Sequence, residues 1–322
     1  MGVFRPKEFL PARLIDRITE LRVTDPERPL RAARSRKRRE QITRDGRLNI
    51  LAADHPARRV LAIPGNPLGM ADRHDYLARI VRVLQRDEVD GVMATMDILE
   101  DLLVLHELLA EDGSAPLLDG KLLIASLNRG GLSGVSWEMD DPMTGATPAT
   151  VAAWNLDGAK ILLRICDDEP DSLRTITATV RAITELNAFG LPMFLEPLPT
   201  VKTEKGYKVV KTSEALTRIV GAASALGDSS RHLWLKLPYC ENYEAVVQAT
   251  TLPILLLGGE STGDPTQFMR EVEAGMSAGS NVRGVLVGRN VLYPGDADPA
   301  DVAAAIGRIL RNQASAETAL DF

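Results

Sequence analysis

The sequence is poor in the residues that build disulfide frameworks, metal centres and membrane spans. Its 322 residues include two cysteines and four histidines, which are scattered and form no CxxC pair. We therefore expect no disulfide framework and no metal centre, although scattered ligands can converge in space. No apolar run reaches the roughly 18 residues of a membrane span, and no signal-peptide stretch begins the chain. These absences predict a cytoplasmic protein without a membrane partner.

An excess of basic charge is also missing. The net charge is −6, with 45% hydrophobic and 25% charged residues, so no global field attracts nucleic acid. The basic run at residues 31–39 could neutralise phosphates, but no aromatic residues interleave it. A solvated helix packed on the domain exterior is the favoured interpretation of this run. We expect no nucleic-acid partner.

The strongest regularity is the alternation of short apolar runs with longer amphipathic segments. Helices are expected at 75–85, 98–109, 172–189, 213–226, 265–278 and 299–310, with Asp97, Asp171 and Asp298 as N-caps. Eight strands are expected at 48–54, 91–95, 122–128, 159–165, 192–197, 233–238, 253–258 and 284–288. Apolar strands separated by helices predict a covered parallel sheet, and eight units favour closure. The α/β fold expected is a single (β/α)8 barrel.

Segments outside the repeats define the expected domain organisation. Residues 1–47 form an N-terminal helical extension, residues 48–312 the barrel and residues 313–322 a C-terminal tail. An open doubly wound sheet would need a GxGxxG motif after the first strand, and Asp54-His55-Pro56 stands there instead. The long connection 129–148 leaves the third strand on the side where barrel active sites form. It suits a lid or a subunit contact, and we expect a homo-oligomer.

Polar residues at the carboxyl ends of the strands are the candidate site residues, because that face carries catalysis in this fold. In chain order they are Asp54, His55, Asn128, Lys160, Arg164, Glu196, Lys236, Gly258, Gly259, Ser261, Gly288 and Arg289. Two lysines and two carboxylates are costly to bury singly, so we expect them to compensate one another.

Lys236 is the candidate nucleophile. Burial and the repulsion between Lys160 and Lys236 should lower the pKa of both amines, and a neutral amine can attack a ketone. The competing interpretation is a strand-end lysine that reaches solvent. Glu196 could shuttle protons or only pair with a lysine. Asp54 could accept a hydroxyl proton or only orient the backbone or His55.

Glycines end the last two expected strands. Gly258, Gly259 and Gly288 would let backbone amides approach an anion, and barrels commonly bind phosphate after these strands. Arg289 would add a charge-assisted contact. Glu260 opposes this interpretation, because a carboxylate repels phosphate unless it turns away. The pattern predicts a phosphorylated small-molecule substrate.

The ordered set resembles the class I aldolases of the tagatose-bisphosphate, deoxyribose-phosphate and archaeal fructose-bisphosphate type, from about residue 48 to residue 309. Asp54 ends strand one, Lys160 lies on strand four, Glu196 on strand five and Lys236 on strand six, as in that family. The resemblance implies metal-independent Schiff-base catalysis without a cofactor. Gly258, Gly259 and Ser261, with Gly288 and Arg289, look like the family's phosphate loops.

The sequence looks especially like a bacterial branch associated with inositol breakdown. That resemblance implies 2-deoxy-5-keto-gluconate 6-phosphate as the substrate. A related group with the same lysine transfers an acyl group from a phosphorylated diketone, so coenzyme A-dependent, thiolase-like transfer stays an alternative. A catalytically silent barrel that binds a sugar phosphate is the other.

Overall fold

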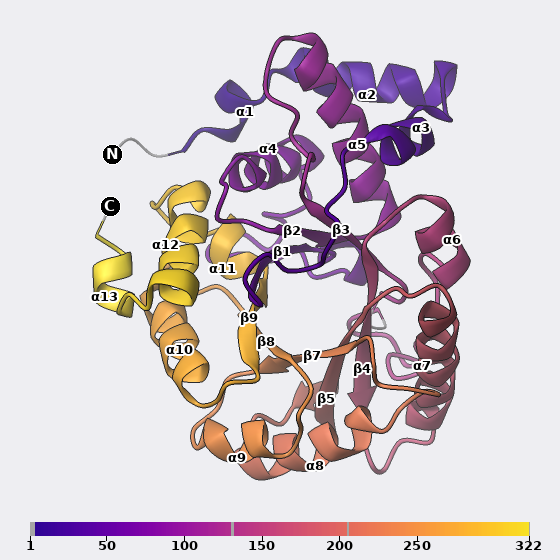
Figure 1. Ribbon diagram of the computed structural model, residues 1–322, viewed down its shortest axis with the longest axis vertical. Helices are drawn as coiled ribbons and strands as arrows, with labels where there is room; N and C mark the ends of the chain where they lie inside the picture. Colours follow the sequence, from indigo (N-terminus) through magenta and orange to yellow (C-terminus); the bar gives the residue numbers. More distant parts are fainter. Residues whose placement is uncertain (1–3, 130–131, 205, 322) are drawn as a thin grey trace.

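The computed structural model describes residues 4–129, 132–204 and 206–321 and forms a closed barrel of parallel strands (Figure 1). The barrel strands are β1 (Leu48–Ala53), β2 (Gly91–Ala94), β3 (Leu122–Ser126), β4 (Gly158–Ile165), β5 (Met193–Thr203), β7 (Leu233–Pro238), β8 (Ile254–Leu257) and β9 (Val282–Val287). They follow the order β4-β3-β2-β1-β9-β8-β7-β5, and pairing of β4 with β5 closes the ring. The predicted (β/α)8 barrel is confirmed.

One hairpin departs from the predicted pattern. β5 continues beyond the barrel rim and pairs with the antiparallel strand β6 (Gly206–Val209). Thr200 lies opposite Val209 in this hairpin. The sequence prediction ended the fifth strand at residue 197, whereas the structure continues it to Thr203.

The barrel interior is built by alternate residues of the strands. Leu48, Ile50 and Ala52 of β1 belong to an inner cluster with Phe194 of β5, and Trp234 of β7 packs against it. Because successive side chains point to opposite faces of a strand, residues two positions further on also face inward. This periodicity directs polar side chains at the carboxyl ends of the strands into the barrel mouth.

The outer layer consists of helices that bury an apolar stripe against the strands. They are α4 (Arg73–Leu84), α5 (Met96–Glu111), α6 (Pro148–Ala153), α7 (Asp171–Ala188), α8 (Ser213–Ser224), α9 (Tyr243–Gln248), α10 (Thr266–Ser277), α11 (Arg289–Leu292) and α12 (Pro299–Asn312). In α4, buried Leu77, Ile80, Val81 and Leu84 repeat with helical spacing. All six predicted helices are present among them.

Only one of the three predicted N-caps is confirmed. The Asp298 carboxylate accepts a hydrogen bond from the backbone amide of Ala300. Asp97 and Asp171 were wrong as caps, because both lie within the first turn of their helices, where a carboxylate still interacts favourably with the helix dipole.

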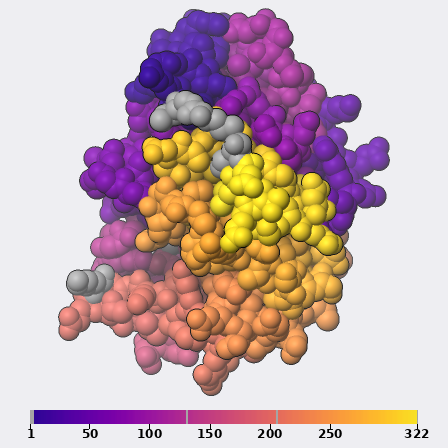
Figure 2. Space-filling view, turned by 90° about the vertical axis from the view of Figure 1, so that its left-hand side faces the viewer, coloured from indigo at the N-terminus to yellow at the C-terminus, as the bar shows by residue number. Residues whose placement is uncertain are grey.

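Helices outside the repeats cover the barrel's flank. In the N-terminal extension, α1 (Pro6–Phe9) packs against α4, while α2 (Ala12–Thr24) and α3 (Arg28–Ser35) pack against α5. At the other end of the chain, α13 (Ala316–Ala319) packs on α10 and α12. In Figure 2 the yellow C-terminal segment accordingly lies against the orange surface of the α10 region. No helix of the described residues is both long and apolar enough to cross a membrane.

The basic run at residues 31–39 is only partly the solvated helix that was predicted. It includes the end of α3, but the segment after the helix passes under the amino-terminal ends of the strands. There Arg36 donates to Asp157 at 2.5 Å and Arg39 to Asp90 at 2.9 Å. Asp157 and Asp90 directly precede β4 and β2. This part of the basic run therefore neutralises carboxylates on the floor of the barrel.

We expect Arg36→Met to lower the free energy of unfolding by about 3 kcal/mol or more, because it breaks a buried ion pair. The Arg36 side chain is 0% exposed, whereas Arg38, which contacts the same Asp157 carboxylate, is 39% exposed. Arg38→Met is the matched control, with an expected loss below about 1 kcal/mol. Urea unfolding measures both variants. Equal small losses would contradict the assignment of Arg36 to the barrel floor.

Candidate active site

A cavity of about 660 Å³ opens at the carboxyl ends of the strands. From the predicted set, the residues that line this cavity are Asp54, His55, Arg164, Glu196, Lys236, Gly258, Gly259, Gly288 and Arg289. Residues from strands that are distant in sequence thus line the same cavity, as expected for this fold.

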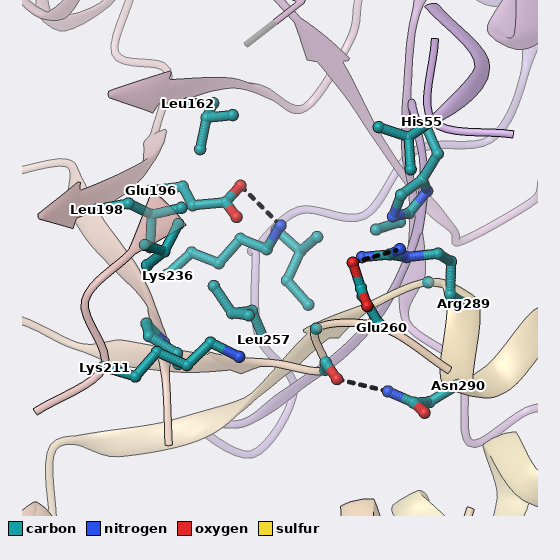
Figure 3. Close-up of a pocket in the computed structure, with 18 of the residues that line it drawn as sticks. His55, Leu162, Glu196, Leu198, Lys211, Lys236, Leu257, Glu260, Arg289 and Asn290 are labelled. Carbon is teal, nitrogen blue, oxygen red and sulfur yellow. Dashed lines mark hydrogen bonds and ion pairs between the residues drawn. The ribbon is translucent and has the colours of Figure 1, made fainter. Parts of the chain in front are cut away.

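Four buried side chains form a continuous row of alternating charge across the barrel interior. The Lys160 Nζ lies 3.1 Å from Asp54 Oδ2 and 3.0 Å from Glu196 Oε2. The Lys236 Nζ donates to the same Glu196 oxygen at 2.8 Å, and Figure 3 shows this contact. The expectation that the two lysines and two carboxylates compensate one another is confirmed.

Strand register brings this row together. Lys160 and Leu162 are two residues apart on β4, so their side chains point to the same face. Leu162 lies opposite Glu196 on β5. Phe194, two residues before Glu196, lies opposite Trp234, two residues before Lys236. Because Glu196 and Lys236 each lie two residues beyond the Phe194–Trp234 pair, they stand at the same level of the barrel, and both side chains point inward.

The two lysines have opposite pKa shifts. Burial and the nearby charge of Lys160 lower the pKa of Lys236, against the opposing effect of Glu196. Burial also disfavours charge on Lys160, but Asp54 and Glu196 outweigh it and raise the pKa of that amine. The prediction that repulsion lowers both pKa values was therefore wrong for Lys160. The reason is that Lys160 lies between two carboxylates, whereas Lys236 contacts one.

Both carboxylates are held in the ionised form. Burial by itself would raise the pKa of Glu196, but Lys160 and Lys236 lower it to about 2. Burial likewise opposes ionisation of Asp54, and the charges of Lys160 and Arg58 hold its pKa well below the usual range. Asp54 pairs with Lys160 rather than hydrogen-bonding to His55, whose Nδ1 lies 4.0 Å from Asp54 Oδ1.

The glycine loops form the side of the cavity at β8 and β9. A side chain on Gly288 would collide with the Ala52 carbonyl and the His55 ring, so this position requires a close backbone approach. Gly259 has a φ of +64°, which glycine adopts without strain. Asn290 donates to the Gly258 carbonyl at 2.5 Å and ties the two loops together (Figure 3).

Three residues that were predicted to bind the substrate instead form hydrogen bonds or ion pairs with other parts of the protein. Asn128 is buried and pairs with both the amide and the carbonyl of Leu162, so it joins β3 to β4. The Ser261 hydroxyl donates to the Tyr293 carbonyl at 2.8 Å. Arg164 lines the cavity but forms an ion pair with Glu138 of the long connection. Residues 130–131 of that connection lie outside the described residues, so its role as a lid or contact stays a prediction.

Sequence reasoning missed several residues of the cavity wall. Arg58 ends the short 3-10 helix η1 (Pro56–Arg58) that follows β1, and it lines the cavity. Lys208 and Lys211 reach the wall from the unpredicted β5–β6 hairpin and the segment after it. The basic residue four positions after Asp54 was a usable signal, whereas the hairpin lysines had none without the fold.

The protein is thus a closed (β/α)8 barrel with a buried row of lysines and carboxylates across its interior. The model of the Cgl0159-like family matches residues 46–309, and the chain belongs to that family. The crystal structure of Cgl0159 from Corynebacterium glutamicum is 36% identical, with a TM-score of 0.87, and covers 95% of this chain and 99% of its own.

More distant similarity reaches proteins named as aldolases. An uncharacterized aldolase of Saccharolobus solfataricus is 31% identical over 139 residues, which are 42% of this chain and 47% of the aldolase. The chain thus matches about half the length of that relative. A Schiff-base-forming fructose-1,6-bisphosphate aldolase shares the fold, with 21% identity and a TM-score of 0.57 over 83% of this chain and 96% of its own.

The lowered pKa of Glu196 predicts that part of the free energy of unfolding is lost in acid. A carboxylate with a depressed folded pKa stabilises the fold above its ordinary value of 4.5, and this stabilisation is lost as the pH falls toward about 2. Glu196→Gln should therefore flatten the dependence of unfolding free energy on pH within that window. Denaturant titrations at several pH values test this. Glu260→Gln, at an exposed carboxylate of the same cavity, is the control for the loss of one carboxylate. An unchanged slope in Glu196→Gln would refute the prediction.

Proposed function

We propose that the protein is a class I aldolase that cleaves a phosphorylated keto-sugar or keto-acid reversibly through a Schiff base on Lys236. The observation that carries this proposal is the asymmetry of the buried row: Lys160 lies between Asp54 and Glu196, whereas Lys236 contacts Glu196 alone and lines the cavity. The pKa shifts of the two lysines have the directions that this arrangement implies. A neutral amine is the form that attacks a carbonyl, and Lys236 is the lysine poised to supply it. Lys160 is held as a cation.

The proposed cycle uses the charge row directly. The Lys236 amine attacks the substrate ketone and forms a carbinolamine, which loses water to give the protonated imine. Asp54 accepts the proton of the hydroxyl that becomes the aldehyde, and the carbon–carbon electron pair moves into the imine. The resulting enamine is then protonated and hydrolysed. Glu196, at 2.8 Å from Lys236 Nζ, exchanges protons with the carbinolamine and the enamine.

Lys160 has an electrostatic role in this proposal. Its charge stabilises the ionised Asp54 and Glu196 and depresses the pKa of Lys236 across the shared Glu196 oxygen. The names of the similar proteins agree with this assignment, since one is called an aldolase and another a Schiff-base-forming aldolase.

The substrate's phosphate is proposed to bind where the β8 and β9 loops meet, at Gly258, Gly259, Gly288 and Arg289. Within this class we propose the inositol-breakdown branch and 2-deoxy-5-keto-gluconate 6-phosphate, whose cleavage would yield a phosphorylated three-carbon ketone. Turnover that requires coenzyme A would instead indicate acyl transfer. Ligand binding without turnover or adduct would indicate a silent barrel.

Lys236→Ala should abolish turnover and the adduct trapped by borohydride, because Lys236 is the amine that forms the imine in this proposal. We would incubate the enzyme with dihydroxyacetone phosphate, reduce it and map the modified peptide by mass spectrometry. The expected mass increase lies on Lys236 in the wild type and is absent from the variant. An adduct on Lys160, or near-normal turnover of Lys236→Ala, would refute the mechanism.

Lys160→Ala should shift the activity optimum to higher pH rather than abolish trapping. Removing this cation ends its repulsion of Lys236 and leaves Glu196 to stabilise the charged amine, so the pKa of Lys236 rises. The pH profiles of kcat and of adduct yield measure the shift. Lys121→Met is a control for loss of a buried lysine elsewhere, since Lys121 bonds to the carbonyls of Arg86 and Val89. An acidic shift in Lys160→Ala would contradict the electrostatic role.

A further inference from the structure

Two arginines, each with a buried Nε that has no hydrogen-bond partner among the described residues, reach the cavity from neighbouring strands. Arg58 follows β1, Arg289 follows β9, and these strands are adjacent in the barrel. Both arginines line the cavity, as does His55. Burial lowers the pKa of Arg289, and the charge of Arg58 lowers it further, so the two cations act on each other.

Each of these three side chains has a buried nitrogen without a hydrogen-bond partner among the described residues. The atoms are Arg58 Nε, Arg289 Nε and His55 Nδ1. Buried polar atoms are nearly always satisfied, so three such atoms around one cavity indicate a ligand that supplies acceptors. His55 is neutral, because burial lowers its pKa to about 3, and a neutral imidazole carries one N–H donor.

Asp54 and Glu196 act on the two guanidinium groups from a distance, but no carboxylate of the described residues forms a close ion pair with either group. Arg58 has no carboxylate oxygen within 4.0 Å in the described chain, and Arg289 has Glu260 at 3.9 Å. The Glu260 side chain is 88% exposed, and it turns toward Arg289 at the cavity edge (Figure 3). A contact that is long and solvated holds a carboxylate weakly.

We propose that Arg58 and Arg289 together bind the phosphate dianion of the substrate, with His55 as a third donor, and that this phosphate displaces Glu260. The proposal rests on the proposed function for the substrate, and it adds Arg58 and Glu260 as residues that determine specificity. Guanidinium groups match phosphate oxygens with paired hydrogen bonds. Two cations favour a dianion over a carboxylate monoanion, which would leave one of them uncompensated.

Glu260 acts in this proposal as a resident counter-ion. It partly balances Arg289 while the site holds no phosphate, and repulsion drives it away when phosphate enters. Because the side chain is already exposed, its displacement costs little. The Glu260 carboxylate thereby excludes weakly bound anions and leaves the site open to phosphate esters.

The test is calorimetric titration of the full-length protein with inorganic phosphate and, separately, with acetate. Arg58→Met should weaken phosphate binding by about ten-fold or more, with little change for acetate. Arg59→Met is the matched control, because the neighbouring Arg59 is exposed and does not line the cavity. Phosphate affinity of Arg58→Met within two-fold of the Arg59→Met value would overturn the proposed arginine clamp, that is, the joint binding of phosphate by Arg58 and Arg289.

Glu260→Gln should strengthen phosphate binding by about three-fold or more, since it removes the competing anion. Glu271→Gln removes a carboxylate from another wall of the cavity and should have a smaller effect. The exposed Glu260 keeps the proposal testable even if Arg58→Met fails to fold. Unchanged or weaker binding in Glu260→Gln, or wild-type protein that binds acetate as well as phosphate, would overturn the proposal.

Borohydride trapping in parallel separates this proposal from the proposed function. Phosphate binding that depends on Arg58, without any adduct on Lys236, would support the clamp and contradict the aldolase mechanism. An adduct on Lys236, with phosphate binding that does not depend on Arg58, would support the aldolase mechanism and contradict phosphate binding by Arg58.

Discussion

The shared Glu196 oxygen is the contact on which the chemistry of this barrel depends. Both lysines lie within 3.0 Å of it, and Asp54 completes the row beyond Lys160. Burying any one of these charges alone would be costly, and alternation removes most of that cost. The same alternation makes the lysines unequal, because the lysine between two carboxylates keeps its proton and the one at the end is the easier to deprotonate. Stability and reactivity thus arise from one arrangement.

The two ends of the barrel have different tasks. At the amino-terminal end, Arg36 and Arg39 pair closely with Asp157 and Asp90, and their hydrogen bonds also reach backbone groups between strands. These contacts leave little charge unbalanced and stabilise the closed ring. At the carboxyl end, the buried row around Glu196 balances its own charges. Nearer the mouth, Arg164 pairs with Glu138, whereas Arg289 has Glu260 only at 3.9 Å and Arg58 has no ion pair within 4.0 Å among the described residues. Arg58 and Arg289 are therefore the cations that an anionic substrate would engage.

Membership of the Cgl0159-like family connects the chain to a crystallised relative that shares the fold over 95% of this chain. The more distant aldolases share the barrel, which many chemistries use, so the fold by itself does not define the reaction. The site itself is what suits Schiff-base chemistry, because a buried amine of lowered pKa faces a cavity of about 660 Å³. Arg58 and Glu260 add a proposed means of selecting the phosphate.

Local pattern determined the strands, the helices and the inward direction of Asp54, Lys160, Glu196 and Lys236, because period-two alternation and apolar runs are properties of short segments. Pattern could not show that Lys160 and Lys236 shift in opposite directions, since the charges that decide this are far apart in sequence: Asp54 and Lys160 are separated by 106 positions. The pattern also could not show that Asn128 hydrogen-bonds to the backbone of β4, that Arg58 reaches the cavity, or that β5 continues into a hairpin. Each of these depends on distances through space, which are established only when the barrel closes.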